Sequence, residues 1–429
     1  MEIELAVLAL LVAAYALVAA RLDRLSIGPA LAFLAIGIVL ADDVLGPISF
    51  TPESGAIRGL AEATLTLLLF VDASTIRARA LAHDIGPVSR LLLIGLPLTI
   101  ALGAVAALVL FPGIPPGLAV LIGSTLAPTD AALGQAVVTN QAVPARIRRL
   151  LNVESGLNDG IATPFVVLGV ALTVAEGGGT TLLSAAVSEL AIGVVVGLVA
   201  GYAGGRLLKE VDRRAWTSPV SRQLFVLALA ASCYLVAVGV GGNGFIAAFV
   251  GGLAFGSGTR GAEHEAVRFT ELQGSLLAIG VWIAFGLTIA GHILTEGIDP
   301  TVLVYAALSL TVIRLVPVAL ALVGSGFALP TVVFVGWFGP RGIASIVFLI
   351  IGLDALEAAG VASEPLGAVV AWTVLLSVVL HGLSAGPLAA WYGRRAAVLD
   401  ADAPELVDDS EPRPPRVHWG GDFRLPPVT

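Results

Sequence analysis

Long apolar runs separated by short polar segments dominate the sequence from its first residues to about residue 392. An α-helix needs about 20 predominantly apolar residues to cross a bilayer, so runs of this length predict transmembrane helices. The pattern predicts an all-α polytopic membrane protein with about thirteen spans. The thirteen runs lie at 4–20, 27–41, 57–73, 89–111, 117–138, 151–175, 181–206, 220–240, 243–257, 273–294, 301–323, 330–352 and 365–392.

The polar segments between the runs alternate in charge along the chain. With the N-terminus outside, the inner segments and the residues just after the last run hold 17 Lys and Arg, against Arg58 alone outside. Lys and Arg collect on the cytoplasmic side of membrane proteins, so the alternation predicts an N-out, C-in protein of the cell (inner) membrane. The outer segments are acidic instead, with Asp42, Asp43, Glu53, Glu176, Glu296, Asp299, Asp354, Glu357 and Glu364.

Composition agrees with a lipid environment. Hydrophobic residues make up 57% of the 429 residues and charged residues 13%, against about 25% charged in soluble domains. The single cysteine, Cys233, excludes an intrachain disulfide framework. Residues 1–395 form the predicted transmembrane domain, and the acidic, proline-rich residues 396–429 are typical of a disordered cytoplasmic tail. Much of the net charge of −8 lies in this tail and the outer segments, and nothing indicates a nucleic-acid partner.

Two of the apolar runs are interrupted by glycine and proline. The fifth run contains Pro128 and the twelfth contains Gly339-Pro340-Arg341-Gly342. If runs 1–6 and 8–13 are two six-helix halves joined by the seventh, each break lies in the fifth member of its half, and the odd linker makes the halves opposite in orientation. Broken spans at matching places in two halves indicate the binding site of an inverted-repeat secondary transporter.

Charged and hydroxyl side chains cluster near the first break. Thr129 and Asp130 follow Pro128, and Glu154-Ser155-Gly156-Leu157-Asn158-Asp159 opens the next run. Asp130 and Asp159 are equally far in sequence from the hairpin centre between Pro144 and Ala145, so helical arms would bring them to similar depth. Ser155, Asn158 and Asp159 share one helix face because they are three and four residues apart. Oxygen ligands with a carboxylate suit hard cations, and no His or Cys is placed to form a softer metal site.

A carboxylate at bilayer depth is a functional-site hypothesis by default. Desolvation disfavours the bare anion, so a buried Asp159 should hold either a proton or a cation. Competition between the two for one carboxylate is already an exchange mechanism. Cation loading should then weaken as the pH falls.

Other polar groups within the runs have structural or functional interpretations. Asp130 is either an ion ligand or a cap for the N–H groups freed at the break. A buried Glu154 needs a partner, and we expect a structural pair with Arg314, with Arg341 near the second break. Asp72 is either an interfacial cap or part of a cytoplasmic ion entrance. His381 is expected to be a packing residue.

These residues resemble the monovalent cation–proton antiporters, specifically the NhaP-type sodium–proton branch. The resemblance rests on Thr129-Asp130, on the Glu154 to Asp159 string and on the Gly339 to Gly342 break, and it spans the chain except the tail. It implies crossed broken helices, a homodimer and alternating access. It also implies that Asp159 carries the ion or proton, with Thr129, Asp130, Ser155 and Asn158 as ligands or orienting groups. Na⁺, or else Li⁺ or K⁺, would be the substrate, and no resident cofactor is implied.

The same resemblance bears on stoichiometry. The related electrogenic branch has a second Asp where this chain has Asn158, so a single titrating carboxylate suggests electroneutral one-for-one exchange. Ala73 after Asp72 departs from many relatives and leaves the cytoplasmic entrance less well defined.

Two other functions are compatible with intramembrane carboxylates. Asp130 and Asp159 could form the dyad of an aspartyl enzyme, or the polar groups could line a cation channel. Neither Asp has a Gly-Asp motif, and the polar residues cluster at one depth, whereas a channel needs a continuous polar pore. Collapse of a pH gradient in vesicles by added sodium would identify an exchanger.

Overall fold

The computed structural model describes residues 2–24, 27–41, 54–75, 86–130, 132–176, 182–259, 264–296, 299–400 and 403–406. Within these ranges every regular element is a helix and none is a strand. A helix satisfies its own backbone N–H and C=O groups, which is what crossing lipid requires. The all-α class predicted from the sequence is therefore confirmed.

Every one of the thirteen predicted runs coincides with helix, and most form one continuous element. The continuous helices are α1 (Glu2–Arg24), α2 (Pro29–Leu40), α3 (Ser54–Ser74), α8 (Ala145–Glu176), α9 (Leu182–Arg213), α10 (Pro219–Gly239), α11 (Gly244–Thr259) and α18 (Leu366–Ala396). Seven helices in the described chain are long and apolar enough to cross a membrane, and several more are apolar but shorter. The count of thirteen spans stays a prediction.

The remaining runs are divided into two or more helical segments. These are η1 (Leu91–Gly95) with α5 (Leu96–Leu110), α6 (Pro116–Thr125) with α7 (Gln135–Val138), α12 (His264–Phe285) with η2 (Gly286–Ala290) and α13 (Gly291–Glu296), α14 (Pro300–Leu310) with α15 (Val312–Ala321), and α16 (Leu329–Trp337) with α17 (Ile343–Ala358). Both predicted breaks are present, between α6 and α7 and between α16 and α17. A third, at Thr311, was not predicted, because no glycine or proline marks it.

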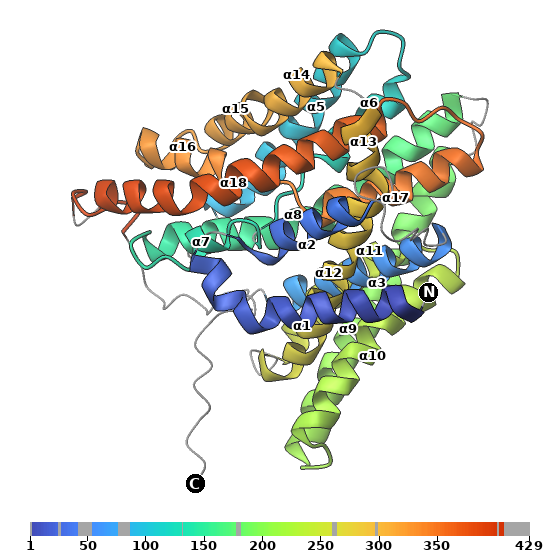
Figure 1. Ribbon diagram of the computed structural model, residues 1–429. Helices are drawn as coiled ribbons and strands as arrows, with labels where there is room; N and C mark the ends of the chain where they lie inside the picture. Colours follow the sequence, from blue (N-terminus) through green and yellow to red (C-terminus); the bar gives the residue numbers. More distant parts are fainter. Residues whose placement is uncertain are drawn as a thin grey trace.

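The helices pack as two bundles (Figure 1). The first contains η1, α5–α8 and α14–α18, and therefore both predicted breaks. The second contains α2, α3, η2 and α9–α12, with α1 joined to α2 through Tyr15 and Phe33, whose ring centroids are 4.9 Å apart. Between the bundles, α3 packs against α8 and α17. Each bundle thus combines two stretches of helices that are separated in the chain, and the site residues of the first break lie in the first bundle.

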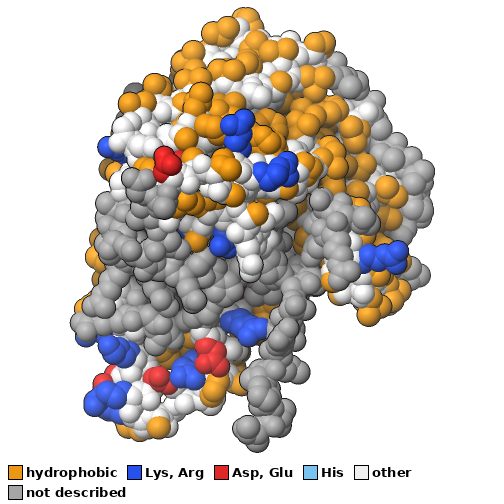
Figure 2. Space-filling model, turned by 90° about the vertical axis from the view of Figure 1, so that its left-hand side faces the viewer, with side chains coloured by type: hydrophobic (Ala, Val, Ile, Leu, Met, Phe, Trp, Pro, Cys, Tyr) orange, Lys and Arg blue, Asp and Glu red, His pale blue; other side chains and the backbone are white. Residues whose placement is uncertain are grey.

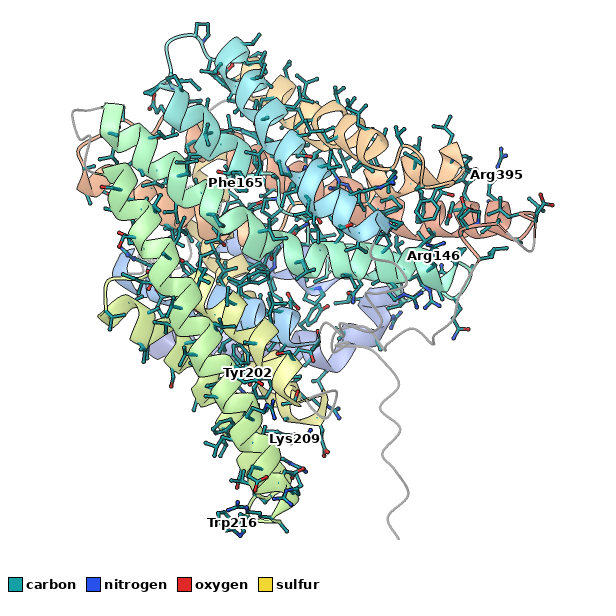
Figure 3. All side chains as sticks on the ribbon, turned by 180° about the vertical axis from the view of Figure 1, so that it is seen from behind. Arg146, Phe165, Tyr202, Lys209, Trp216 and Arg395 are labelled. Carbon is teal, nitrogen blue, oxygen red and sulfur yellow. The ribbon has the colours of Figure 1, made fainter. Side chains whose placement is uncertain are left out.

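Apolar side chains remain exposed on the outer helices. Val187, Val195, Leu198 and Val199 on α9 are all more than half exposed. Such a stripe would be unfavourable in water but is what lipid tails cover. Beyond it, the end of α9 projects from the bundles with Tyr202, Lys209 and Trp216 (Figure 3).

The end of the molecule where α16 begins and α18 ends carries basic side chains. Figure 2 faces this side and shows Lys and Arg, with a few Asp and Glu, among hydrophobic and other side chains. It is the side predicted to be cytoplasmic. Asp42, Asp43, Glu53, Arg77, Arg79 and Arg260, which also entered the topology prediction, lie outside the described residues.

The segment predicted to be a solvated tail begins with ordered structure. Residues 403–406 pack against the first bundle, and Glu405 among them is 1% exposed. These residues are therefore part of the folded structure, and composition does not reveal the partners of the buried Glu405 carboxylate. The domain boundary at residue 396 stays a prediction. The rest of the predicted tail, 407–429, lies outside the described residues.

Candidate functional site

The first break brings three polar side chains together in the protein interior. The Thr129 hydroxyl lies 2.9 Å from the Ser155 hydroxyl, and Asn158 Nδ2 donates to Thr129 Oγ1 at 2.6 Å. All three residues are at least 96% buried. Thr129 comes from the extended chain after α6, whereas Ser155 and Asn158 share one face of α8. The structure therefore joins the two segments that the sequence singled out.

Asp159 continues the same face of α8, one turn beyond Ser155. It is partly exposed, whereas Asn158 before it is buried. Its neighbour Gly160 lies against the ring of Phe249 on α11, since a Cβ at this glycine would come within 2.2 Å of the ring. Asp159 therefore lies on the part of α8 that meets the second bundle.

Asp72 on α3 also faces α8. The nearest atoms to a Cβ built at Gly156 are those of the Asp72 side chain, at 3.6 Å and 3.9 Å. Asp72 and Asp159 are thus both placed where the two bundles meet along α8. The choice between an interfacial cap and an ion entrance for Asp72 stays a prediction.

Asp130 links the two breaks. Its backbone N–H donates to Pro340 O at 2.8 Å, and its Oδ2 accepts from the N–H of Ile343, the first residue of α17, at 3.3 Å. Oδ1 accepts from Ala132 N at 2.8 Å. A carboxylate here satisfies N–H groups at the start of α17 and opposes the positive end of its dipole. The structure thus places Asp130 as a cap, one of its two sequence readings.

Arg341 makes the reciprocal contact across the crossing. Its guanidinium donates to Ala127 O at 3.0 Å and Pro128 O at 3.3 Å, two carbonyls of the non-helical chain just after α6. The side chain is fully buried. A cation at the negative end of α6 and an anion at the positive end of α17 neutralise both half-helix dipoles. The two breaks therefore hold each other in place electrostatically.

Glu154 and Arg314 form a two-contact ion pair, with Nη1–Oε1 at 2.6 Å and Nη2–Oε2 at 2.9 Å. Both side chains are 2–3% exposed. The pair connects α8 to α15. Arg314 also lies against the second break, because a Cβ at Gly339 would be 2.5 Å from Arg314 Nε and 3.1 Å from Thr129 Cγ2. The Glu154 carboxylate is therefore held in a buried ion pair between α8 and α15.

Two residues of α18 support the second break, and sequence reasoning did not assign them to the site. Ser377 Oγ accepts from the Arg341 backbone N–H at 2.6 Å. His381 Nδ1 lies 3.2 Å from Ser377 Oγ, and Nε2 lies 2.9 Å from Trp337 O, the carbonyl at the end of α16. Their signal in the sequence is a pair of polar residues four apart in an apolar run, which predicts a shared helix face but no partner.

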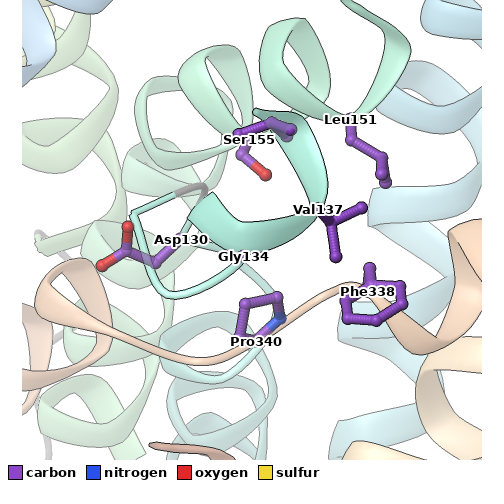
Figure 4. A pocket seen from close by; sticks show the side chains of 8 residues that line it. Asp130, Gly134, Val137, Leu151, Ser155, Phe338 and Pro340 are labelled. Atoms are coloured by element: carbon purple, nitrogen blue, oxygen red, sulfur yellow. The ribbon is translucent and has the colours of Figure 1, made fainter. Parts of the chain in front are cut away.

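A small pocket lies between α7, α8 and the second break (Figure 4). Ser155 points into it, whereas the Asp130 carboxylate points away from Val137 and Phe338 (Figure 4).

Within the described chain, Asn158 Oδ1, Thr125 Oγ1 and Ser345 Oγ are among the buried side-chain atoms without a hydrogen-bond partner. Unsatisfied buried oxygens invite a donor or a cation. Among the described residues no group of three or more His, Cys, Asp or Glu could hold a metal ion.

The fold with two crossed breaks and a buried oxygen cluster defines an ion-transport type of membrane protein. Residues 7–391 match the model of the family described as sodium/hydrogen exchanger, transmembrane. The chain belongs to the sodium/hydrogen exchanger family, and the NhaP-type resemblance is confirmed.

Several characterised proteins are similar to the chain. It is 27% identical over 366 residues to a K(+)/H(+) antiporter NhaP of Alkalimonas amylolytica, which covers 84% of this chain and 62% of that protein. It is 27% identical over 264 residues to Na(+)/H(+) antiporter 2 of Zygosaccharomyces rouxii, covering 58% of this chain and 33% of that protein. The chain thus spans about a third to three fifths of these two relatives.

The fold is also that of a solved structure. The sodium proton antiporter MjNhaP1 from Methanocaldococcus jannaschii superposes with a TM-score of 0.72 at 22% identity, covering 91% of this chain and 99% of that one. This similarity shows that the two proteins share a fold.

Proposed function

We propose that the protein exchanges a monovalent cation for H⁺ across the membrane in which it lies, with both competing for Asp159. The observation that carries the proposal is the oxygen cluster of Thr129, Ser155 and Asn158, one helical turn from Asp159 at the crossing of two broken helices. The names of the relatives above include both Na⁺/H⁺ and K⁺/H⁺ antiporters. Thr129, Ser155 and Asp159 are the proposed cation ligands, and the transported cation is the substrate.

The contacts of Glu154 and Asp130 support electroneutral one-for-one exchange. Glu154 is bound by Arg314, and Asp130 accepts from the start of α17. Asn158 carries no titrating proton and its amide donates to Thr129. One carboxylate then holds either one cation or one proton, so a full cycle moves no net charge.

The division into two bundles supports alternating access. Asp159 and Asp72 lie where α8 of the first bundle faces α3 and α11 of the second. A shift of one bundle against the other would expose Asp159 to either side in turn. The homodimer implied by the family resemblance stays a prediction.

The test is cation-driven proton exchange in proteoliposomes. Purified protein is reconstituted with a pH dye inside, and Na⁺, Li⁺ or K⁺ is added in separate runs. We expect at least one cation to collapse a preset pH gradient, at a rate unaffected by an imposed membrane potential. The apparent KM for that cation should rise as the pH falls, because protons compete for Asp159.

Asp159→Asn is the matched variant, since it keeps the side-chain shape and removes the charge. We expect folded protein, judged by size-exclusion chromatography, with exchange no faster than in empty liposomes. Near wild-type exchange in this variant would reject Asp159 as the carrier. A potential-driven current without coupled proton movement would favour the cation channel. If the protein showed neither exchange nor current, the aspartyl enzyme would be the remaining alternative.

A further inference from the structure

Residues 403–406, just beyond α18, pack against the first bundle. Ala403 N donates to Asp400 O and Leu406 N donates to Ala403 O, both at 2.9 Å. Between them, Glu405 is 1% exposed although it lies close to the cytoplasmic end of the protein. A carboxylate is almost never fully buried unless it is paired. The partners of Glu405 therefore indicate what this segment does.

Glu405 caps the half-helix α16. Its Oε1 accepts from Ala328 N at 2.7 Å and from Thr331 Oγ1 at 2.9 Å. Ala328 is the residue just before α16, and it has no side-chain cap of its own. In a capping box, a Glu at the third helical position would accept this N–H, but that position holds Thr331. The missing carboxylate is supplied from 74 residues further along the chain.

The same segment also contacts the start of α8. The guanidinium of Arg146, the second residue of α8, donates to Pro404 O. Arg146 also lies over the ring of Phe327, 5.4 Å from its centroid, just before α16. Figure 3 shows Arg146 and Arg395, near the end of α18, at the same end of the molecule. Residues 404 and 405 thus join the start of α16 to the start of α8.

A third contact ties the capped end to α18. The Thr331 hydroxyl lies 3.0 Å from Tyr392 Oη, and the Tyr392 ring stacks on Phe334 at 4.1 Å. With nine residues, α16 is too short to be stable alone, so contacts at its two ends set its position. One end is the crossing, where Arg341 of the second break binds the first break and Asp130 of the first break binds the second. The other end is Glu405.

We propose that Glu405 is a positioning residue for ion exchange: it anchors α16, and Pro404 with Arg146 ties α16 to α8, so that the crossing and the ligands on α8 move as one body. The proposal rests on the exchange function above. Loss of the anchor would let α16 shift relative to α8, and the distances between the proposed cation ligands around Thr129 would then vary more. The cation would then bind more weakly even in folded protein.

The test compares nested truncations and point variants in the exchange assay. A chain ending at residue 406 keeps the anchor, and one ending at residue 402 loses it together with only three more residues. We expect wild-type apparent KM for the cation in the first and a several-fold higher KM in the second. Glu405→Ala should match the shorter chain, and Glu405→Gln, which keeps an acceptor oxygen, should be milder. Glu411→Gln is the control carboxylate further along the tail.

A rescue separates positioning from general destabilisation. Thr331→Glu in the Glu405→Ala background places a carboxylate at the third helical position, from which it can reach the Ala328 N–H as in a capping box. We expect the apparent KM to return toward the wild-type value. An unchanged KM in folded Glu405→Ala protein would overturn the proposal, as would a lowered yield of folded protein with normal KM. Absence of exchange in the wild type would instead reject the function itself.

Discussion

At the scale of single residues, the site is built from charges that neutralise backbone ends. Asp130 accepts a hydrogen bond from the start of α17, and Arg341 donates to a carbonyl just after α6. Glu154 forms an ion pair with Arg314. Asp159 is the carboxylate that the proposed exchange assigns to cation and proton binding. Residue types and spacing singled out all of these positions, but the division of roles among three carboxylates depends on which partner each one meets.

The buried pair of Glu154 and Arg314 makes a stability prediction. Glu154→Gln leaves the guanidinium of Arg314 buried without its counter-ion, which should destabilise the protein by about 3–5 kcal/mol. The double variant Glu154→Gln/Arg314→Met removes both charges and should recover most of that loss. Thermal unfolding in detergent measures both. Equal melting temperatures for the single variant and the wild type would show that the pair is not structural.

At the scale of elements, the two breaks are held by close approach of backbone to side chain. A Cβ at Gly342 would lie 2.2 Å from Asp130 Oδ2, so only glycine leaves space for the cap. Gly339 is restricted in the same way by Arg314. The glycines that marked the second break in the sequence are therefore needed for packing across the crossing. The break at Thr311 has no glycine or proline beside it.

Gly342→Ala tests the crossing. The added methyl group has to displace the Asp130 carboxylate, and overpacking of this kind should destabilise by about 1–3 kcal/mol. Exchange should fall as well, because the cap of α17 is displaced. Gly367→Ala near the start of α18 is the matched control, since nothing lies within 4 Å of its Cβ. Similar melting temperatures and exchange rates in the two variants would argue against a tight crossing.

At the scale of the whole molecule, two bundles meet along α8 and α17. Arg58 on α3 reaches Asp354 on α17, with Nη1 3.5 Å from Oδ2, and also binds Glu62 at 2.8 Å. Both residues lie toward the side predicted to be outside. Arg58 and Asp354 thus bridge the two bundles at one end, where relative movement would separate them.

A cross-link between the bundles tests alternating access. Arg58→Cys/Asp354→Cys, in a Cys233→Ala background, should lose exchange when treated with a short thiol-cleavable bifunctional reagent and regain it with reductant. Arg222→Cys/Asp212→Cys is the control, because that ion pair joins α10 to α9 within one bundle, with Nη1 2.6 Å from Oδ1. Continued exchange in fully cross-linked Arg58→Cys/Asp354→Cys protein would contradict movement of one bundle against the other.

The sequence by itself determined the all-helical membrane class, the two main breaks and the segments that form the site. The signals for these features are local, so they can be read from one chain. They are hydropathy over a bilayer's thickness, glycine and proline at the breaks, and polar groups in apolar runs. Only the tertiary structure decided that Asp130 caps α17, that Ser377 and His381 support the crossing, and that Glu405 reaches back to α16. Each of these contacts depends on a partner that is distant in the chain. Residue spacing within one segment does not show which distant group will hydrogen-bond to the unpaired backbone groups at a helix end.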